Sequence, residues 1–309
     1  MPARPILIGT RGSPLALWQA RHVAVRLREA HGLSDGEVDL RGITTSGDRL
    51  QDKPLADFGG KGLFTKEIDE ALLRGEVALA VHSMKDLPSV LPEGLCVAAV
   101  LPRADVRDAF LSPKGPSLME LPPGATVGTS SLRRGAQVKR LRPDLRVIDF
   151  RGNVETRLRK LEEGVADATL LAMAGLDRLG LASHVTAILS VDEMLPAVAQ
   201  GAIGVVARTD DRETKELLAP LNDKVTETAV RCERAFLGRL DGSCRTPIAG
   251  LAEVADGIVR FRGLILTPSG AEWHDIEVTG AAAHAQALGR DAGEELLARA
   301  GPNFLASLP

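Results

Sequence analysis

Residues 77–86 read VALAVHSMKD, and this stretch decides the fold class. Its first five residues, 77–81, are all apolar, which predicts a short buried strand. His82, Ser83, Met84, Lys85 and Asp86 follow at once, and four of these five side chains are polar. In sheets built from parallel strands, ligands bind just beyond the carboxyl ends of the strands. The stretch therefore predicts a buried sheet with a functional site at its edge.

The same order of strand, polar loop and helix opens the chain. Residues 5–9 (PILIG) predict a strand followed by Arg11, and Ser13 and Pro14 favour the N-cap and first turn of a helix that reaches about residue 30. Further strands are predicted at residues 38–43, 126–128, 145–149, 168–172 and 203–207, and further helices at residues 65–74, 132–142, 154–163 and 226–240. Repeated units of this kind predict an α/β fold, in which helices cover both faces of a parallel sheet.

Two segments break this alternation. Residues 44–62 are polar and contain glycine, with neither the strand nor the helix period, and a loop of that length usually has a function. Residues 258–266 and 273–279 alternate like strands around a turn, and residues 283–300 form an amphipathic helical pattern. We therefore expect a separate small α+β domain at the end of the chain.

Length and composition restrict the class of protein. The chain has 309 residues, more than one core usually holds, so we expect two or three domains. A formal net charge of −3 and 3% aromatic residues argue against nucleic acid or a membrane surface as a partner. No apolar stretch reaches the roughly 18 residues of a membrane span, and the first residues lack the apolar run of a signal peptide. We expect a cytoplasmic protein.

Cysteine, histidine and glycine patterns argue against several kinds of site. Cys96, Cys232 and Cys244 are odd in number and form no CxxC pair, so neither a disulfide framework nor a zinc site is predicted. The six His residues show no metal-ligand spacing, and no metal is expected. Residues 59–62 (GGKG) do not complete a phosphate-binding loop, because glycine follows the lysine where Ser or Thr is needed.

Arginines gather where predicted strands end. Residues 129–134 (TSSLRR) join a strand to a helix, so hydroxyls, backbone N–H groups and the helix dipole there favour a bound anion. Arg151 ends a strand, Arg157 lies on the next helix, and Arg11 takes the matching place after the first strand. Because guanidinium groups bind carboxylates with a planar fork, these positions predict a substrate rich in carboxylates. The alternative is a general excess of Arg from codon usage, with solvated side chains.

Asp86 and Cys244 are the remaining candidates for chemistry. Asp86 is the strongest acid candidate among the arginines, where a carboxylate can steady a developing positive charge or move protons. The alternative is a surface ion pair with Lys85 or a turn aspartate. Cys244 lies in a glycine-bearing loop, DGSCRTP, where a thiol can be a nucleophile or an attachment point, or simply a small buried residue.

Eight stretches closely resemble those of the porphobilinogen deaminase, or hydroxymethylbilane synthase, family. They are RGSPLALWQA (11–20), GGKGLFTKE (59–67), HSMKDLP (82–88), VGTSSLRR (127–134), RGNVETRL (151–158), LAMAGLDRLG (171–180), LPAVAQGAIG (195–204) and the loop of Cys244. They occur in the expected order over nearly the whole chain, which makes the match highly specific.

The resemblance implies a fold and a domain order. It implies two doubly wound domains that resemble type II periplasmic binding proteins, with the active cleft between them, plus the small α+β domain. The expected boundaries are residues 1–101 for domain 1, to which the chain returns at residues 202–219, residues 102–201 for domain 2, and residues 220–309 for domain 3. The segment 44–62 would cover the cleft, and the protein is expected to be a monomer.

The resemblance also implies a reaction. Members of the family are transferases of tetrapyrrole and haem biosynthesis that condense four porphobilinogen molecules, with loss of ammonia, into the linear hydroxymethylbilane. In the family the product grows on a dipyrromethane cofactor held by a thioether to one cysteine, which by this resemblance is Cys244.

Carried over residue by residue, the resemblance assigns the site. Asp86 is the catalytic carboxylate. Cofactor binding falls on Cys244, Lys85, Asp86, Thr129, Ser130, Ser131, Arg133, Arg134, Arg151 and Gly152. Substrate binding falls on Arg11, Ser13, Gln19, Lys61, Phe64, Arg151, Arg157, Arg178 and Gln200. Two positions depart from the usual pattern: Asp57 stands where lysine is common, and Ser243 precedes the cysteine where glycine is usual.

Two other classes remain as alternatives. A solute-binding protein or the effector domain of a regulator would share the two-lobed fold, but neither needs Cys244. A different cysteine-dependent transferase acting on a polycarboxylate is the second alternative.

Overall fold

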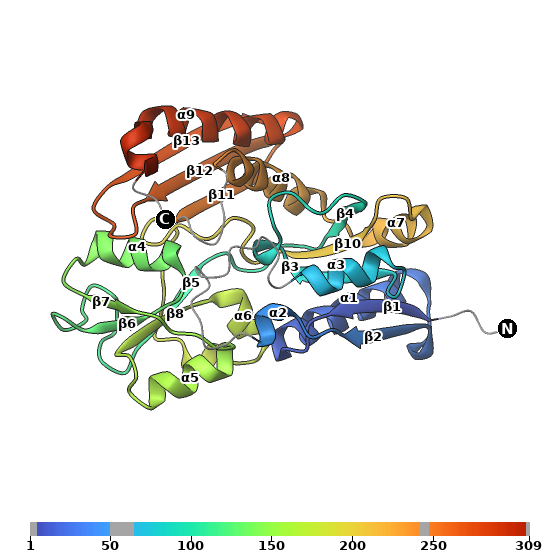
Figure 1. Ribbon diagram of the computed structural model, residues 1–309, viewed down its shortest axis with the longest axis horizontal. Helices are drawn as coiled ribbons and strands as arrows, with labels where there is room; N and C mark the ends of the chain where they lie inside the picture. Colours follow the sequence, from blue (N-terminus) through green and yellow to red (C-terminus); the bar gives the residue numbers. More distant parts are fainter. Residues whose placement is uncertain (1–4, 50–64, 241–246, 307–309) are drawn as a thin grey trace. The chain divides into compact units, whose positions relative to one another are not determined.

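The computed structural model describes residues 5–49, 65–240 and 247–306 (Figure 1). The Cα atoms group into two compact units, one within residues 1–104 and 202–227 and the other within residues 105–201 and 228–309. Within the described ranges no helix is both long and apolar enough to cross a membrane. The three-domain division predicted above stays a prediction.

A mixed sheet forms the centre of the first unit. In its described part, five strands lie in the order β2-β1-β3-β10-β4. Strand β1 is parallel to β2 and β3, whereas β10 is antiparallel to β3 and β4. The sheet predicted to be parallel is therefore mixed, because β10 enters from a distant part of the chain and can pair antiparallel without a crossover helix. The strands are β1 (Ile6–Thr10), β2 (Val38–Gly42), β3 (Leu79–Ser83), β4 (Leu95–Val100) and β10 (Ile203–Arg208).

Helices pack on both faces of this sheet. Ile8 of β1 packs in a core with α1 (Pro14–His31), while its neighbour Gly9 faces Ile68 of α3 (Lys66–Leu73). Helix α1 begins as predicted, since the Ser13 side chain accepts a hydrogen bond from the N–H of Ala16 at 3.3 Å. It ends at Gly32, whose φ of 64° is the left-handed conformation that glycine adopts without strain. The short α2 (Ser46–Arg49) and α7 (Arg212–Leu218) complete this unit.

The second unit contains a five-stranded mixed sheet that resembles the sheet of the first unit. The described strands lie in the order β7-β6-β8-β5-β9, with β6 parallel to β7 and β8 and with β5 antiparallel to β8 and β9. In both sheets three parallel strands are thus followed by an antiparallel one, so this sheet is also mixed rather than wholly parallel. The elements are β5 (Asp108–Leu111), β6 (Thr126–Gly128), β7 (Arg146–Ile148), β8 (Ala168–Ala172), β9 (Ala187–Ile188), α4 (Leu132–Leu141), α5 (Val154–Glu162) and α6 (Met173–Arg178).

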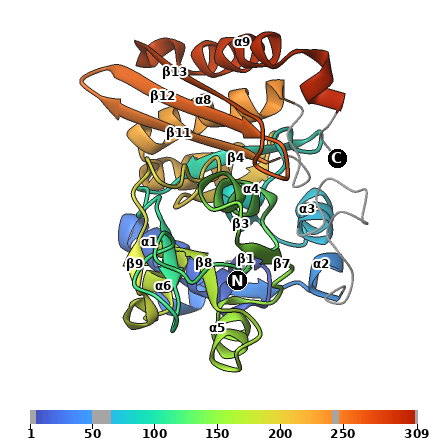
Figure 2. The same ribbon diagram turned by 90° about the vertical axis from the view of Figure 1, so that its left-hand side faces the viewer.

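An antiparallel sheet with two helices forms the end of the chain, as predicted. The strands are β11 (Ile248–Ala255), β12 (Ile258–Leu266) and β13 (Trp273–Ala281), and the helices are α8 (Lys224–Arg239) and α9 (Ala285–Ala306). Figure 2 shows α9 running along this sheet. One face of the sheet packs with Phe236 of α8 and Leu296 of α9, and the other face includes Leu264 beside Ala136 of α4. The fold is therefore mixed α/β with a small terminal α+β part.

Several boundaries differ from the predictions. Strand β3 begins at Leu79, two residues late, and continues through His82 and Ser83. The segment 44–62, predicted to be irregular, contains α2 in its described part. Six elements were not predicted from the sequence: β4, β5, β9, β11, α6 and α7. Short 3-10 helices lie at Asp35–Glu37, Met84–Asp86, Ala182–His184, Ala219–Leu221 and Ala282–His284.

Candidate active site

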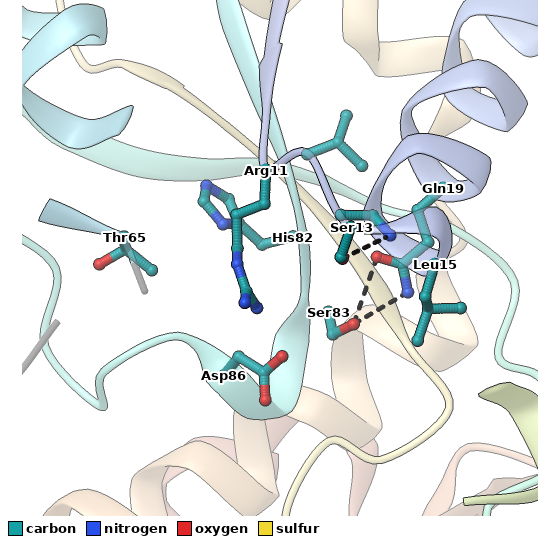
Figure 3. A pocket seen from close by; sticks show the side chains of 10 residues that line it. Arg11, Ser13, Leu15, Gln19, Thr65, His82, Ser83 and Asp86 are labelled. Carbon is teal, nitrogen blue, oxygen red and sulfur yellow. Dashed lines mark hydrogen bonds between the residues drawn. The ribbon is translucent and has the colours of Figure 1, made fainter. Parts of the chain in front are cut away.

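A pocket lies at the carboxyl ends of β1 and β3, where the sequence predicted a site (Figure 3). Arg11 follows β1, and Asp86 ends the 3-10 turn that follows β3. In Figure 3 the Arg11 guanidinium points toward the Asp86 carboxylate. The pocket is lined by Arg11, Ser13, Leu15, Ala16, Gln19, Thr65, Val81, His82, Ser83 and Asp86. One pocket therefore brings together a cation, a carboxylate and several hydroxyl groups.

Gln19 fixes one wall of the pocket. It is buried on α1, and its side-chain nitrogen and oxygen lie 2.9 Å and 3.2 Å from the Ser83 hydroxyl. This contact joins α1 to the end of β3. Gln19, which was predicted to bind substrate, therefore lies in the wall of this pocket. Ser83 was not predicted to be a site residue.

The turn that carries Asp86 packs closely against the backbone at the start of β10. Met84 is buried, and its N–H donates to the carbonyl of Ala202 at 3.0 Å, just before β10. A Cβ on Gly204 of β10 would run into the Met84 side chain, so a larger residue here would displace Met84. Asp86 itself is exposed at the rim, like its neighbour Lys85. The carboxylate is thus accessible to a ligand while its backbone is held.

His82 lines the pocket although it was not predicted to be a site residue. It is almost fully buried. Burial, and then the charge of Arg11, lower the pKa of His82 to about 4. Its Nε2 has no hydrogen-bond partner among the described residues. Because of this low pKa, His82 is a neutral imidazole at ordinary pH. The sequence signal that could have identified His82 was its position at the end of a predicted strand.

Arg133 and Arg134 are buried at the start of α4 rather than open to solvent. Ser131 caps this helix, accepting from the N–H of Arg134 at 3.4 Å, and Thr129 accepts from the N–H of Ser131 at 3.2 Å. Both guanidinium groups contact Asp108 of β5, which is fully buried: Arg133 Nη2 lies 2.7 Å from one carboxylate oxygen and Arg134 Nη2 lies 2.7 Å from the other. Much of their hydrogen-bonding capacity is therefore used within the protein.

Asp108, which contacts both predicted arginines, was not among the residues predicted for the site. Burial alone would raise the pKa of Asp108, but the two guanidinium groups hold it well below its usual range. The two arginines and the aspartate therefore form a buried cluster with one net positive charge. An aspartate that opens the apolar run DAFL was the available signal.

Gln200 joins the same cluster. It is fully buried, and its side-chain amide donates to Asp108 Oδ1 and to the carbonyl of Val106, both at 2.8 Å. The carbonyl of Gly201, the next residue along the chain, accepts from Nη2 of Arg178 at 2.7 Å. Burial lowers the pKa of Arg178 to about 10, so it remains a cation.

The loop after β7 holds the remaining predicted residues of this unit. The Ser130 hydroxyl donates to Asp149 and accepts from the N–H of Phe150 at 3.0 Å. Gly152 has a φ of 124°, a conformation that other residues rarely adopt. Arg151 Nε lies 3.6 Å from Asp149, and Arg157 follows on α5. Lys61, Phe64 and Cys244, with the departures Asp57 and Ser243, lie outside the described residues.

The donor set fits a ligand made of pyrrole rings with acidic side chains. Such a ligand needs cations and hydroxyls for its carboxylates and an acceptor for its ring N–H groups. Arg11 and Ser13 supply the first need, and Asp86 supplies the second. Within the described ranges no group of three or more His, Cys, Asp or Glu side chains is arranged to hold a metal ion.

Comparison with known proteins agrees with this chemistry. Residues 6–216 match the model of "Porphobilinogen deaminase, dipyromethane cofactor binding domain", and residues 227–298 match "Porphobilinogen deaminase, C-terminal domain".

Curated relatives match nearly end to end. Porphobilinogen deaminase of Nitrobacter winogradskyi is 56% identical over 297 residues, covering 96% of this chain and 94% of that protein. That of Paracoccus denitrificans is 55% identical over 303 residues, covering 98% of this chain and 97% of that protein. Among solved structures, the methionine binding protein MetQ matches 71% of this chain and 89% of its own, at 14% identity and a TM-score of 0.44. On the family models and the curated relatives, the chain belongs to the porphobilinogen deaminase family.

Proposed function

We propose that this chain is a transferase that joins four porphobilinogen molecules head to tail, releasing one ammonia at each step, and then frees hydroxymethylbilane by hydrolysis. The product is the linear tetrapyrrole of porphyrin and haem biosynthesis. Family membership supports the reaction, and the pocket of Arg11 and Asp86 supports its location in this chain.

One observation carries the proposal: Arg11 and Asp86 face each other in one pocket. Loss of ammonia from the aminomethyl group of porphobilinogen leaves positive charge on the pyrrole. The Asp86 carboxylate accepts a hydrogen bond from the pyrrole N–H and stabilises that charge. After the new carbon–carbon bond forms, the same carboxylate assists loss of the proton from the ring α-carbon. Arg11 pairs with a substrate carboxylate, and the neutral His82 adds no competing positive charge.

Most of the residues that would hold the dipyrromethane cofactor lie in the second unit. When bound, the cofactor supplies the pyrrole α-carbon to which the first substrate is joined. Arg133 and Arg134, tied to Asp108, offer one net positive charge that favours its carboxylates. The full set we assign to the cofactor is Lys85, Asp86, Thr129, Ser130, Ser131, Arg133, Arg134, Arg151 and Gly152, with Cys244 as the thioether.

The substrate carboxylates would be held by the remaining predicted residues. These are Arg11, Ser13, Gln19, Lys61, Phe64, Arg151, Arg157, Arg178 and Gln200. We further propose the three-domain division at residues 1–101 with 202–219, 102–201 and 220–309, a monomeric state and a cytoplasmic location.

Intact mass and ammonia release test this function together. The purified chain should weigh more than its sequence by one dipyrromethane, and Cys244→Ser should weigh what its sequence predicts. The wild-type chain should release four ammonia molecules for each hydroxymethylbilane. An unmodified wild-type mass together with no ammonia from porphobilinogen would refute the proposal, and so would binding of porphobilinogen without turnover.

A further inference from the structure

Glu233 is a fully buried acid on α8 that the reaction described above does not use. One of its carboxylate oxygens accepts from the N–H of Ala199 at 2.5 Å, and the other accepts from the N–H of Ala252 at 2.8 Å. Ala252 lies on β11, whereas Ala199 lies in the segment between β9 and β10. The side chain therefore joins α8 and β11 to a segment that has no strand or helix of its own.

Ala199 is held in an unusual backbone conformation. Its φ is 60°, and among the described residues only Ala199 and Asp256 combine a side chain with positive φ. The left-handed conformation is unfavourable for an L-residue because Cβ crowds the following carbonyl oxygen. It persists only where surrounding contacts hold it, and the hydrogen bond to Glu233 is such a contact.

The residue after Ala199 meets the buried arginine cluster. Gln200 is fully buried, and its amide donates to Asp108 Oδ1 at 2.8 Å, beside the contacts from Arg133 and Arg134. Because the backbone of Ala199 sets the direction in which Gln200 leaves, the left-handed turn directs this amide to Asp108. The carbonyl of Gly201, next along the chain, accepts from Arg178 at 2.7 Å.

We infer that Glu233 is a positioning residue: by holding Ala199 in the left-handed conformation, it sets Gln200, Asp108 and through them the arginines that bind ligand carboxylates. The effect on catalysis rests on the proposed function. The effect on the backbone does not, since it follows from the contacts of Glu233 alone.

The two oxygens of Glu233 explain why this position needs a carboxylate. Each accepts from a different backbone N–H. In Glu233→Gln one oxygen becomes an NH₂ group, which would face an N–H donor and leave both donors of that contact unsatisfied. Glu233→Gln would then lose either the hydrogen bond that holds the turn at Ala199 or the one that joins α8 to β11.

A rescue experiment tests the inference. We compare wild type, Glu233→Gln, Ala199→Gly and the double variant, with Glu294→Gln as the control for loss of an exposed acid on the neighbouring helix. Ammonia release from porphobilinogen gives kcat and KM, and urea unfolding gives the midpoint.

Glu233→Gln is expected to lower kcat/KM about tenfold, mainly by raising KM, since the arginines lose their position. Glycine adopts positive φ without strain, so Ala199→Gly in that background should restore kcat/KM to within about threefold of wild type. Ala199→Gly alone and Glu294→Gln should stay near wild type. A merely structural role for Glu233 would lower the urea midpoint without this recovery of KM.

Two outcomes overturn the inference. In one, Glu233→Gln keeps the wild-type kcat/KM. In the other, the KM of the double variant is no better than that of Glu233→Gln, whatever the urea midpoint does. If the wild-type chain itself releases no ammonia, the proposed function fails instead. The urea midpoints then still test the coupling, which requires that Glu233→Gln destabilise the chain less when residue 199 is glycine.

Discussion

Arg134 holds Asp108 through two of its nitrogen atoms, Nε at 3.2 Å and Nη2 at 2.7 Å, both on the same carboxylate oxygen. The carboxylate is fully buried and the guanidinium nearly so. Taking two charges out of water is costly, and the arrangement is stable only because each charge keeps its partner. The contact turns a pair of adjacent arginines, which sequence alone would leave solvated, into a fixed cationic cluster.

Removing Asp108 should therefore be severe. In Asp108→Ala both guanidinium groups stay buried without their counter-charge, and we expect a loss of about 3 to 5 kcal/mol in the free energy of unfolding, measured in urea at neutral pH. Asp105→Ala, which removes a more exposed partner of Arg107, should cost less than about 1 kcal/mol. Equal effects of the two variants would contradict the buried cluster.

Asp69 should respond to pH in a way that can be measured. Burial raises the pKa of Asp69 to about 6, although the Thr65 hydroxyl opposes this. The folded state then holds its proton more tightly than the unfolded state, so the contribution to stability is complete below about pH 4 and is lost as pH rises through 6.

Asp69→Asn should thus stabilise the chain more at pH 8 than at pH 5, by on the order of 1 to 2 kcal/mol in urea unfolding. Glu70→Gln, on the same helix but half exposed, serves as the control for loss of a carboxylate from this helix. The same gain at pH 5 and pH 8 for Asp69→Asn would rule out a raised pKa.

Asp86→Asn tests the carboxylate proposed for catalysis. The amide keeps the size of the side chain but carries no negative charge, so ammonia release should fall about 10² to 10⁴-fold. Because Asp86 is exposed, the melting temperature should stay within a few degrees of wild type. Glu93→Gln, another exposed acid, should keep full activity. Activity of Asp86→Asn within a few-fold of the parent would remove Asp86 from the mechanism.

Gly204→Ala should misplace Asp86 without touching it. An added Cβ runs into the Met84 side chain at the start of the turn that ends with Asp86, and a shift of that turn should lower kcat/KM about 10 to 100-fold. Adding Met84→Ala to this variant shortens the obstructing side chain and should restore part of the lost kcat/KM. Gly42→Ala on β2, where an added Cβ meets open space, is the matched control. No change in Gly204→Ala would show that the turn does not depend on this contact.

The local structure of the site could be predicted from the sequence. Ser13, Pro14 and Gly32 define the ends of α1 by their own backbone preferences, and the apolar run before His82 defines a strand whatever its neighbours are. Arg11 and Asp86 were placed at strand ends for the same reason, and the structure brings both to one pocket. These features depend on residues within about one turn or strand of each other.

Only the tertiary structure decided which segments far apart in the chain are in contact. The sequence cannot say that β10 pairs antiparallel between β3 and β4, because pairing depends on where the chain returns. Nor can it say that Asp108 binds Arg134, 26 residues away, or that Glu233 holds Ala199, 34 residues away. Each of these polar groups is buried, and a buried charge or N–H is stable only with a partner that folding brings to it. The sequence by itself determined which side chains stand at the strand ends, and the tertiary structure decided which of them are held and by what.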